Sequence, residues 1–453
     1  MVFLRATVLA LALYITQGTC DGCDGEDAVL LQQERKVPKE VKGRKVSKSA
    51  RKHKLQALET HPAKTGTKEK VAEDPDQVDL EDDLKGYNFE AYCREFGKKY
   101  SGEEQIKREE AFSKSLAIVK AHNARASTFR LGINEFTDWY DEELKGLRGL
   151  AKDRRKSGAK SKAFHKGDDE DDKMPESWDW RDQGDYSTPV KNQGHCGSCW
   201  AFAATAVIES HVAINAGFVS TLGPQMIVSC AKNPRQCGGT GGCDGATAQI
   251  AFDFVKNNSL TYAEVIAYSS FWGGNGECTS NEKNLHDTTT MVGRYRKYPV
   301  ASITGFVTNP TNDYKALIKA LVIHGPQAIS VDASHWSAYE SGIADFCNPD
   351  ENIDIDHAVV LMGYGEEGGT KYWTIRNSWG TLWGEDGYLR LIRHEDEEGY
   401  CGTDHTPSHG SLCADEHVTE QHVCGTCGIL FDTSYPTGAG YYNEEENDIG
   451  VNR

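Results

Sequence analysis

The stretch Asn192-Gln193-Gly194-His195-Cys196-Gly197-Ser198-Cys199-Trp200 leads directly into a long helix pattern. Apolar residues with helical spacing run from Cys199 to Ala216, and Gly217 is a suitable C-terminal stop. A thiol at a helix N-terminus lies at the positive end of the dipole beside unpaired N–H groups, and both favour the thiolate. A buried structural cysteine would not explain the glycines around it. We therefore interpret Cys199 as a candidate nucleophile and the Gln193 amide as a candidate oxyanion donor.

A histidine and an asparagine further along the chain complete this candidate set. His357 stands just before an apolar strand pattern, Asn377 stands just after the next one, and a Gly-rich turn separates the two strands. A simple antiparallel register that places Tyr364 opposite Thr370 also places His357 opposite Asn377. The Asn carbonyl would then accept an imidazole N–H and set the tautomer. Alone, His357 is more readily a structural histidine; together with Asn377 and Cys199 it is a candidate base.

Length and composition limit the classes of protein to consider. The chain has 453 residues, enough for two or three domain-sized units, and 38% hydrophobic with 26% charged residues is a globular balance. A formal charge of −18 argues against general nucleic-acid binding, which needs a basic face. Fourteen cysteines indicate an oxidising compartment.

The first twenty residues predict a secretory route. Arg5 is followed by an apolar run over 6–15 and by small and polar residues over 18–20, a pattern typical of a signal peptide over 1–20. The run is too short to span a membrane, and no later segment is long enough either. A buried N-terminal strand is the alternative interpretation. We expect no membrane span, and a destination that is either a lysosome or vacuole or the cell exterior.

The next segments differ in charge and pattern. Residues 21–83 form a basic leader, with 13 Lys or Arg against 4 Asp or Glu over 31–72, and they are expected to be flexible, although a basic run also suits acidic surfaces. Residues 84–173 begin with two amphipathic helix patterns separated by Ser101-Gly102. The acidic run 168–172 predicts an exposed loop, and the large domain is expected to begin at about Met174.

Beyond Met174, helix patterns come first and strand patterns afterwards, which favours an α+β arrangement in two subdomains. The predicted helices cover residues 199–216, 248–255 and 314–323, and the predicted strands cover 328–332, 358–364, 371–376 and 388–392. The acidic residues 437–453 are expected to form a tail.

The run Cys-Gly-Ser-Cys-Trp with His357 and Asn377 resembles the papain and cathepsin L-like cysteine peptidases. The string Asn377-Ser378-Trp379-Gly380 is similar to that family as well. His357 and Asn377 follow Cys199 by 158 and 178 residues, more than the roughly 130–150 usual there, which implies insertions. The resemblance, which covers 174–436 and the upstream helices, implies an α+β papain-like fold. That fold has a helical left subdomain and a β-barrel-like right subdomain, preceded by a helical propeptide.

The resemblance also implies an activity and its residues. Cys199 would be the nucleophile, His357 its imidazolium partner, Asn377 the residue that orients His357, and Gln193 part of the oxyanion hole. The expected function is a cysteine endopeptidase, made as an acid-activated zymogen, that cleaves protein or peptide substrates as a monomer without cofactor or metal. No insertion resembles an occluding loop of the cathepsin B type, which favours an endopeptidase over a dipeptidyl exopeptidase. The alternative is a catalytically silent homologue that acts as a binding or inhibitor protein.

The upstream helices resemble the inhibitory propeptide of that family. Glu104, Arg108, Phe112, Val119 and Asn123 fall at the spacing of its long-helix motif, with Ser115 and Val119 as mild departures. Its second motif is matched by Gly132, Asn134, Phe136 and Asp138. The segment would then lie through the active-site cleft, and protonation of carboxylates such as Asp138 and Glu104 would weaken it in acid.

Eleven cysteines follow Met174, and ten remain when Cys199 is set aside. The family pattern implies the pairs Cys196–Cys243, Cys230–Cys278 and Cys347–Cys427. Cys237, Cys401, Cys413 and Cys424 then allow three connectivities. Zinc is an alternative for Cys424 and Cys427, which lie near several histidines, but a secreted chain favours disulfides. Cys401, Cys413 and Cys424 belong to a Cys-rich insertion over 394–426, which either shapes the cleft or is a stapled surface loop.

The resemblance assigns substrate-binding residues too. The pocket for the second residue before the cut is expected to be lined by Ala248, Ser330, Ile355, Ala358 and, at its floor, Asp432. An acidic floor would accept basic as well as apolar side chains, unless Asp432 points to solvent. Gly245 and Ala246 would bind the substrate backbone, and Trp379 would shield the His–Asn bond. Asn257 begins the sequon Asn-Asn-Ser, a candidate glycosylation site that is nearly as readily an unused surface asparagine.

Overall fold

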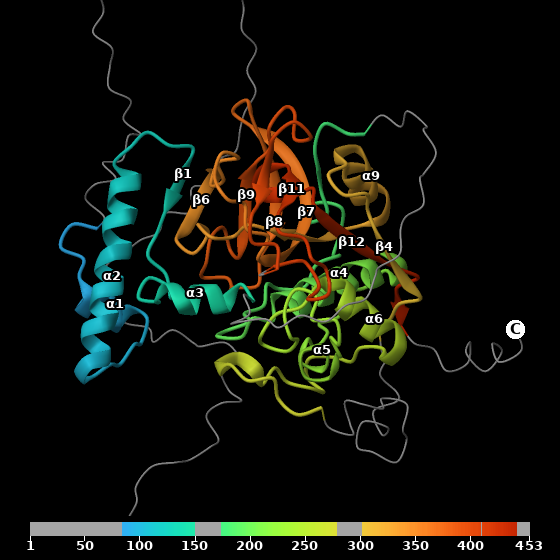
Figure 1. The fold of residues 1–453 in the computed structure, drawn as a ribbon, viewed down its shortest axis with the longest axis horizontal. Coiled ribbons are helices and arrows are strands. Elements are labelled where there is room, and N and C mark those ends of the chain that lie inside the picture. The colour runs from blue at the N-terminus through green and yellow to red at the C-terminus, as the bar shows by residue number, and fades with distance from the viewer. Residues whose placement is uncertain (1–83, 150–173, 279–300, 409, 442–453) are drawn as a thin grey trace, which may run out of the picture. The chain divides into compact units, whose positions relative to one another are not determined.

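The computed structural model describes residues 84–149, 174–278, 301–408 and 410–441 (Figure 1). The predicted signal peptide, the basic leader and the acidic run 168–172 lie outside these residues, as does most of the predicted tail.

The propeptide segment begins with two helices, as the apolar spacing predicts. Helix α1 covers Phe89–Glu95 and α2 covers Gly102–Asn123, with the break between them over 96–101. The side chain of Asn88 caps α1 by accepting the Ala91 N–H. The rings of Phe89, Tyr92 and Phe112 form a small core of their own between the two helices.

After α2 the propeptide joins the main sheet. Strand β1 (Phe129–Leu131) pairs antiparallel with β6 (Tyr339–Ala344), so that Phe129 lies opposite Gly342. A Cβ atom on Gly342 would lie 2.4 Å from the Thr128 carbonyl oxygen, and the φ of Gly342 is +92°, so only glycine fits this close approach. Helix α3 (Asp141–Leu147) then leads the chain towards Cys199.

The helical subdomain is centred on α4 (Cys199–Ala216), which begins and ends as the sequence predicts. Gly217 terminates it with a φ of +79°. Every residue from Cys199 to Ala213 is buried, because α4 lies between the other helices and the sheet (Figure 1). The surrounding helices are α5 (Gln225–Cys230), α6 (Ala248–Asn258) and the short η2 (Ser270–Trp272).

The sheet of the second subdomain has the strand order β1-β6-β9-β8-β7-β5-β12-β4, and β2 also pairs with β7. Its remaining strands are β2 (Trp178–Asp179), β4 (Gly305–Thr308), β5 (Gln327–Val331), β7 (His357–Glu367), β8 (Thr370–Arg376), β9 (Tyr388–Ile392) and β12 (Asp432–Thr437). Helix α9 (Tyr314–His324) covers it beside β7. β3 (Ala301–Ser302) pairs with β13 (Gly440–Tyr441), so ordered chain continues beyond residue 436.

The register of the β7–β8 hairpin differs from the prediction. Tyr364 lies opposite Trp373 rather than Thr370, and Val360 lies opposite Arg376. The strands continue through most of the expected turn, which leaves only Gly368 and Gly369 as the loop, both with positive φ. An irregularity between Leu361 and Gly363 then shifts the pairing by one residue. His357 is therefore not directly opposite Asn377 in the ladder.

Five disulfides join ten of the described cysteines, and Cys93 and Cys199 are free thiols. Three coincide with the pairs implied by the family resemblance, Cys196–Cys243, Cys230–Cys278 and Cys347–Cys427. The four remaining cysteines pair as Cys237–Cys413 and Cys401–Cys424. Cys424 and Cys427 of the alternative zinc motif are thus both disulfide-bonded.

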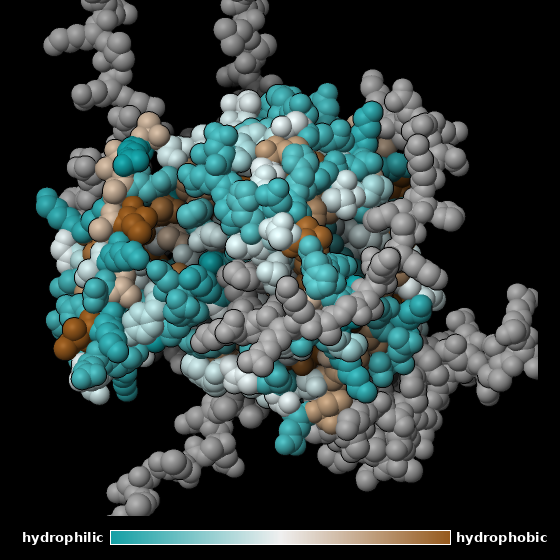
Figure 2. Space-filling model, in the orientation of Figure 1, coloured by the Kyte–Doolittle hydropathy of each residue, from teal (hydrophilic) through white to brown (hydrophobic). Residues whose placement is uncertain are grey.

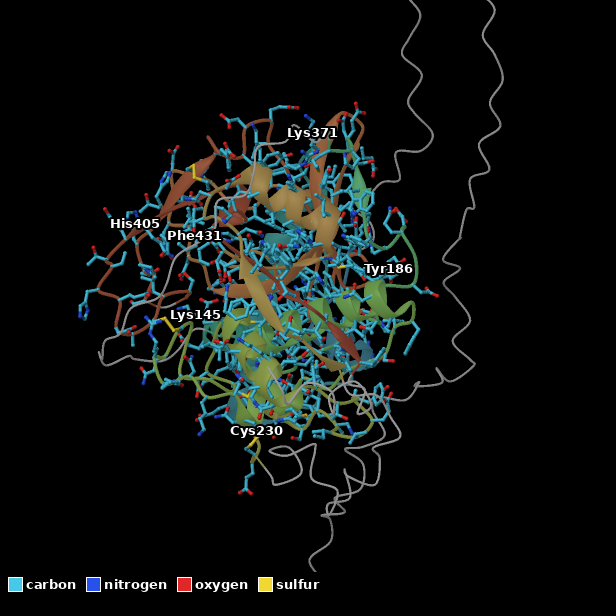
Figure 3. The ribbon with its side chains drawn as sticks, turned by 90° about the vertical axis from the view of Figure 1, so that its right-hand side faces the viewer. Lys145, Tyr186, Cys230, Lys371, His405 and Phe431 are labelled. Carbon is cyan, nitrogen blue, oxygen red and sulfur yellow. A yellow bond between two sulfur atoms is a disulfide. The ribbon has the colours of Figure 1, made fainter. Side chains whose placement is uncertain are left out.

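The Cys-rich insertion contains a hairpin of β10 (Cys401–Asp404) and β11 (Gln421–Cys424), followed by η3 (Thr426–Gly428). Figure 3 shows His405 of this insertion on the same side of the molecule as Lys145 of α3. The face of the molecule seen in Figure 2 is mostly hydrophilic, with scattered apolar residues. In the part of the chain that the structure describes, no helix combines the length and apolar composition of a membrane span.

The small core between α1 and α2 predicts the effect of a truncation. Phe112 is 2% exposed, so Phe112→Ala should lower the free energy of unfolding of the propeptide helices by about 3–5 kcal/mol. Ile106 lies on the same helix but is 68% exposed, so Ile106→Ala should change it by less than about 0.5 kcal/mol. Denaturant unfolding of the Cys199→Ala zymogen, which cannot process itself, provides the measurement. Equal effects of the two changes would contradict the packing described here.

Candidate active site

Cys199 is the first residue of α4 and is 3% exposed. The backbone before it approaches two other segments closely. A Cβ on Gly197 would lie 2.5 Å from the Cys243 carbonyl oxygen and 2.8 Å from that of Gly146, so this position requires glycine. The disulfide from Cys196 to Cys243 holds the same turn. The Gly-rich approach seen in the sequence therefore serves to place the thiol.

The imidazole of His357 is bonded to Asn377 despite the altered register. His357 Nε2 and Asn377 Oδ1 are 2.9 Å apart, and both residues are buried. Because an amide oxygen can only accept, Nε2 carries the proton and Nδ1 is left with its lone pair in the neutral ring. Nδ1 is buried without a hydrogen-bond partner. His357 and Cys199 line one cavity, so this lone pair is the available base.

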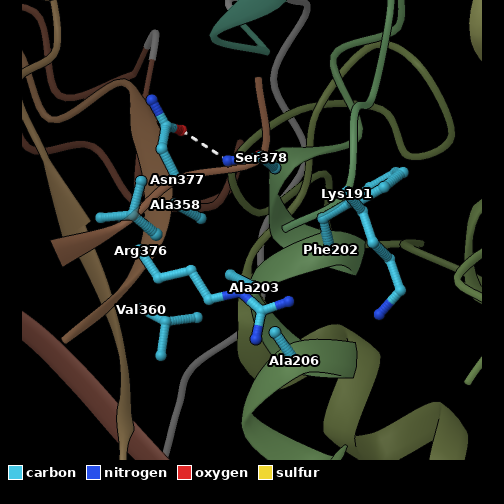
Figure 4. Close-up of a pocket in the computed structure, with 10 residues that line it drawn as sticks. Lys191, Phe202, Ala203, Ala206, Ala358, Val360, Arg376, Asn377 and Ser378 are labelled. Carbon is cyan, nitrogen blue, oxygen red and sulfur yellow. Dashed lines mark hydrogen bonds between the residues drawn. The ribbon is translucent and has the colours of Figure 1, made fainter. Parts of the chain in front are cut away.

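The position of Asn377 is set by its neighbours on three sides. Asn377 Oδ1 also accepts the Ser378 backbone N–H at 2.8 Å (Figure 4). The indole of Trp379, 1% exposed, lies 4.9 Å from the His357 ring and covers the pair. Behind them is a small cavity, about 10 Å³, between α4 and β7 and β8 (Figure 4). There Arg376 donates to Thr188 Oγ1 and to the Pro189 carbonyl, which anchors the end of β8.

The side-chain amide of Gln193 points at the same centre. Its Oε1 accepts the Ser378 hydroxyl at 2.7 Å, which fixes the orientation of the amide. Its Nε2 donates to the Cys196 carbonyl at 2.8 Å and to the Leu147 carbonyl at 2.7 Å. A carbonyl oxygen of the propeptide thus lies on the donor expected to bind an oxyanion.

The end of α3 covers the nucleophile. Cys199 Sγ lies 3.7 Å from the Arg148 carbonyl oxygen. Gly149 approaches Gly245 so closely that a Cβ on Gly245 would lie 2.3 Å from the Gly149 oxygen. Upstream, the Trp139 ring stacks on His195 at 4.2 Å, so the segment crosses the cleft from His195 to Gly245.

A buried ion pair fastens this segment beside the imidazole. Arg148 Nε lies 2.6 Å from Asp356 Oδ2, and the two side chains are 9% and 0% exposed. Burial raises the pKa of Asp356, and Arg148 opposes that rise, while Asp332 and Asp354 add to it. Sequence reasoning missed Arg148 and the role of Asp356, because no motif marks a residue whose partner is 208 positions away in the chain.

With the propeptide in place, both members of the candidate pair are held neutral. Burial raises the pKa of Cys199 to about 12 and lowers the pKa of His357 to about 4. The hydrogen bond to Asn377 opposes the fall for His357, but desolvation is the larger effect. Desolvation under the propeptide therefore favours the neutral thiol and imidazole over the ion pair.

Only some of the predicted substrate-binding residues line one cavity in the structure. Gly245, Ala246, Ser330, Ile355 and Ala358 line the cavity that contains Cys199 and His357. Ala248, Trp379 and Asp432 do not line it. Asp432 accepts hydrogen bonds from Ser330 Oγ and Gln249 Nε2, each at 2.7 Å, and burial raises its pKa. These neutral donors already occupy the carboxylate that was predicted to recognise a basic side chain.

Two other predicted features are separate from this centre. Asn257 is exposed near the end of α6, where its amide donates to the Asp253 carbonyl. Among the described residues, two clusters have metal-ligating side chains, Cys401 with His422 and Cys424, and Cys413 with Asp415 and Glu416. Their cysteines are disulfide-bonded and Arg235 pairs with both acids, so these contacts account for the clusters.

Two family models match separate parts of the chain. Residues 174–411 match the papain family cysteine proteases, and residues 89–144 match the cathepsin propeptide inhibitor domain.

Individual relatives agree with these matches. The oryzain beta chain of rice is 36% identical over 75% of this chain, which spans 63% of the rice protein. Bovine pro-cathepsin H is 34% identical over 68% of this chain, which spans 86% of that protein. Human cathepsin L2 is 33% identical over 71% of this chain and 90% of its own length.

Solved structures of similar zymogens share the fold. A recombinant stem bromelain precursor is 30% identical, with a TM-score of 0.57 over 77% of this chain and 97% of its own. A digestive procathepsin L2 proteinase from the larval midgut of Tenebrio molitor is 28% identical, with a TM-score of 0.57 over 77% of this chain and 98% of its own. These findings, with the buried Cys199 and the His357–Asn377 pair under a propeptide segment, show that the chain belongs to the papain family of cysteine proteases.

Proposed function

We propose that the chain is the zymogen of a cysteine endopeptidase that uses Cys199, His357, Asn377 and Gln193. The observation that carries this proposal is the Gln193 amide, which donates to a propeptide carbonyl directly beside the Cys199 thiol. An oxyanion formed at that thiol would find the same donor. No observation favours a catalytically silent homologue, because all four side chains are present and arranged around one centre.

The chemistry follows from the contacts once the propeptide has left. Water then reaches the centre, which relieves the desolvation of both groups, and the Cys199 proton moves to Nδ1 of His357. The thiolate attacks the peptide carbonyl, and the oxyanion accepts hydrogen bonds from Gln193 Nε2 and the Cys199 N–H. His357 donates its proton to the leaving amine. It next takes a proton from the water that hydrolyses the thioester and regenerates the thiol.

The direction of the propeptide explains how it inhibits without being cut. Substrate residues before the cut are expected to lie at Gly245 and Ala246, so a substrate runs from there towards His195. The propeptide crosses from His195 to Gly245, in the opposite direction. The Leu147 carbonyl reaches Gln193, but the atoms that follow it point the wrong way for acyl transfer.

The remaining assignments are also proposals. The propeptide covers 84–173 and the peptidase 174–436, with ordered chain to Tyr441, and the enzyme acts as a monomer on proteins or peptides. Five disulfides support a secretory route that ends in a lysosome, a vacuole or the cell exterior. Asn257 is a glycosylation site, supported by its exposure.

Replacing the nucleophile tests the proposed function. After incubation at about pH 4.5 with a mild reductant, the wild-type chain should be trimmed near Met174 and hydrolyse peptidyl-coumarin substrates, whereas Cys199→Ala should show no hydrolysis. Iodoacetamide should label Cys199 much faster in the trimmed enzyme than in the zymogen, because burial raises its pKa to about 12 in the zymogen. A wild-type chain that is trimmed by an added protease but stays inactive would support the silent homologue.

The Arg148–Asp356 pair predicts a leaky zymogen when it is broken. Arg148→Ala leaves a buried carboxylate without its cation, which should weaken the hold of the propeptide by about 3 kcal/mol, or roughly 100-fold. Basal peptide hydrolysis by the uncleaved chain at neutral pH is the measurement. Lys114→Ala is the matched control, because its pair with Asp141 is exposed at 67% and 73%, and it should leave basal activity unchanged.

Acid activation should depend on carboxylates paired with Arg108. The hydrogen bond from Arg108 lowers the pKa of Glu104 below its ordinary 4.5, so this pair stabilises the propeptide above that pH and is lost as the pH falls. Glu104→Gln mimics the protonated side chain and should raise the pH at which half of the zymogen activates. Glu90→Gln, in an exposed pair with Arg94, should not shift it. An unchanged midpoint for Glu104→Gln would exclude this contact as an acid trigger.

A further inference from the structure

The Cys-rich insertion reaches the active-site cleft. We define the strap as residues 410–413 of the insertion, which lie shortly before the acidic pair Asp415 and Glu416. The hairpin of β10 and β11 supports it from the sheet side, closed by Cys401–Cys424. The strap therefore belongs to a loop whose two ends are held together by a hairpin and a disulfide.

At one end the strap lies directly on the wall of the cleft beside His357. A Cβ on Gly410 would lie 1.7 Å from the Ile355 carbonyl oxygen and 3.6 Å from the Asp356 nitrogen. No side chain fits in that gap. Gly410 is therefore in close contact with the sheet subdomain at Ile355, which precedes the candidate base His357 by two residues.

At the other end the strap is fastened to the helical subdomain. The Leu412 carbonyl accepts the Gly238 N–H at 3.1 Å, and Cys413 is disulfide-bonded to Cys237. The next residue, Ala414, donates to the Arg235 carbonyl at 3.0 Å. Arg235 in turn pairs with Asp415 at 3.0 Å. Within four residues the strap thus touches one wall of the cleft through Gly410 and is joined to the other by the Cys237–Cys413 disulfide.

The connection lies over the pocket that receives the acyl part of a substrate. Gly410 and Ser411 line the same cavity as Ala246, Ser330 and Ile355, on the Gly245 side of Cys199. In the zymogen, where Arg148 of the propeptide also lines this cavity, its volume is about 20 Å³. Ser330 and Ile355 are expected to line the pocket for the second residue before the cut, and the strap lies against Ile355, so the third residue would meet the strap.

On the basis of the proposed function, we propose that the strap closes the cleft beyond the second residue before the cut. The favoured substrates are then peptides with only two residues on that side, so that cleavage releases an amino-terminal dipeptide. Interior bonds are cut only where the chain turns out of the cleft after the second residue. Endopeptidase cleavage therefore continues at a lower rate.

A blocked substrate series tests the closure, because it changes length at constant charge. The trimmed enzyme is given acetyl-Leu-Arg-aminomethylcoumarin and the same dipeptide extended by one, two and four glycines before Leu. The dipeptide should be cleaved with a kcat/KM at least tenfold above that of every longer substrate. A kcat/KM that stays level or rises with length would overturn the proposal and leave the strap a surface staple.

Two variants separate the strap from other causes of a length preference. Gly410→Ala forces the strap off Ile355, and the double change Cys237→Ser with Cys413→Ser releases its far end. Each should reduce the penalty for extended substrates to less than threefold, because the kcat/KM of the longer substrates rises relative to that of acetyl-Leu-Arg. Gly440→Ala, with no atom within 4 Å of the added carbon, is the control and should keep the wild-type pattern.

The outcomes distinguish this inference from the proposed function. If no substrate is cleaved and an epoxysuccinyl inhibitor does not label Cys199, the peptidase function itself fails and the inference fails with it. Activity with no dependence on length refutes only the closure. If the double serine variant does not fold, Gly410→Ala still decides the question, because it leaves all five disulfides intact. A penalty that persists in Gly410→Ala would also refute the closure.

Discussion

The position of the N-terminus of α4 against the end of β7 is the constraint on which the site depends. Cys199 comes from one subdomain and His357 from the other, so neither can act unless the two pack in one arrangement. The buried length of α4 supplies this arrangement, because every residue from Cys199 to Ala213 is buried against helices or sheet. Gln193 adds a direct bond across the boundary through the Ser378 hydroxyl. The same packing that forms the core therefore assembles the catalytic groups.

The propeptide leaves this arrangement of Cys199 and His357 intact but disfavours the charged forms of both side chains. By excluding water, it makes the charged forms of Cys199 and His357 costly, so the pair stays neutral although its geometry is complete. It compensates for its own burial of Asp356 with Arg148. Inhibition thus has two parts, the occupation of the Gln193 donor and the removal of charge from the pair. Both end when the segment leaves.

Local patterns predicted the elements well and their long-range relations less well. The limits of α4 follow from apolar spacing and Gly217, which are local signals. The partners His357 and Asn377 were identified correctly as a pair that interacts, but through a register that is wrong. Its turn is shorter than expected, and an irregularity at 361–363 shifts the ladder. Their hydrogen bond nevertheless forms, because Asn377 lies beyond the end of β8 and its side chain is not held to the ladder. Family resemblance named Asp432 as a pocket floor, but the strand pairing with Ser330 gives it a neutral partner that no motif reveals.

The pairing of the last four cysteines shows why such relations matter for function. Counting left three connectivities open, and they differ in which cysteine of the insertion is joined to Cys237. Cys401–Cys424 closes the base of the hairpin over 23 residues, whereas Cys237–Cys413 spans 176 residues and connects the two subdomains. The first bond shapes a loop; the second determines where that loop lies, and it lies across the acyl side of the cleft. An insertion that local sequence presents as an ordinary stapled loop is thereby placed where it limits the substrate, and the chemistry of the family is kept unchanged beneath it.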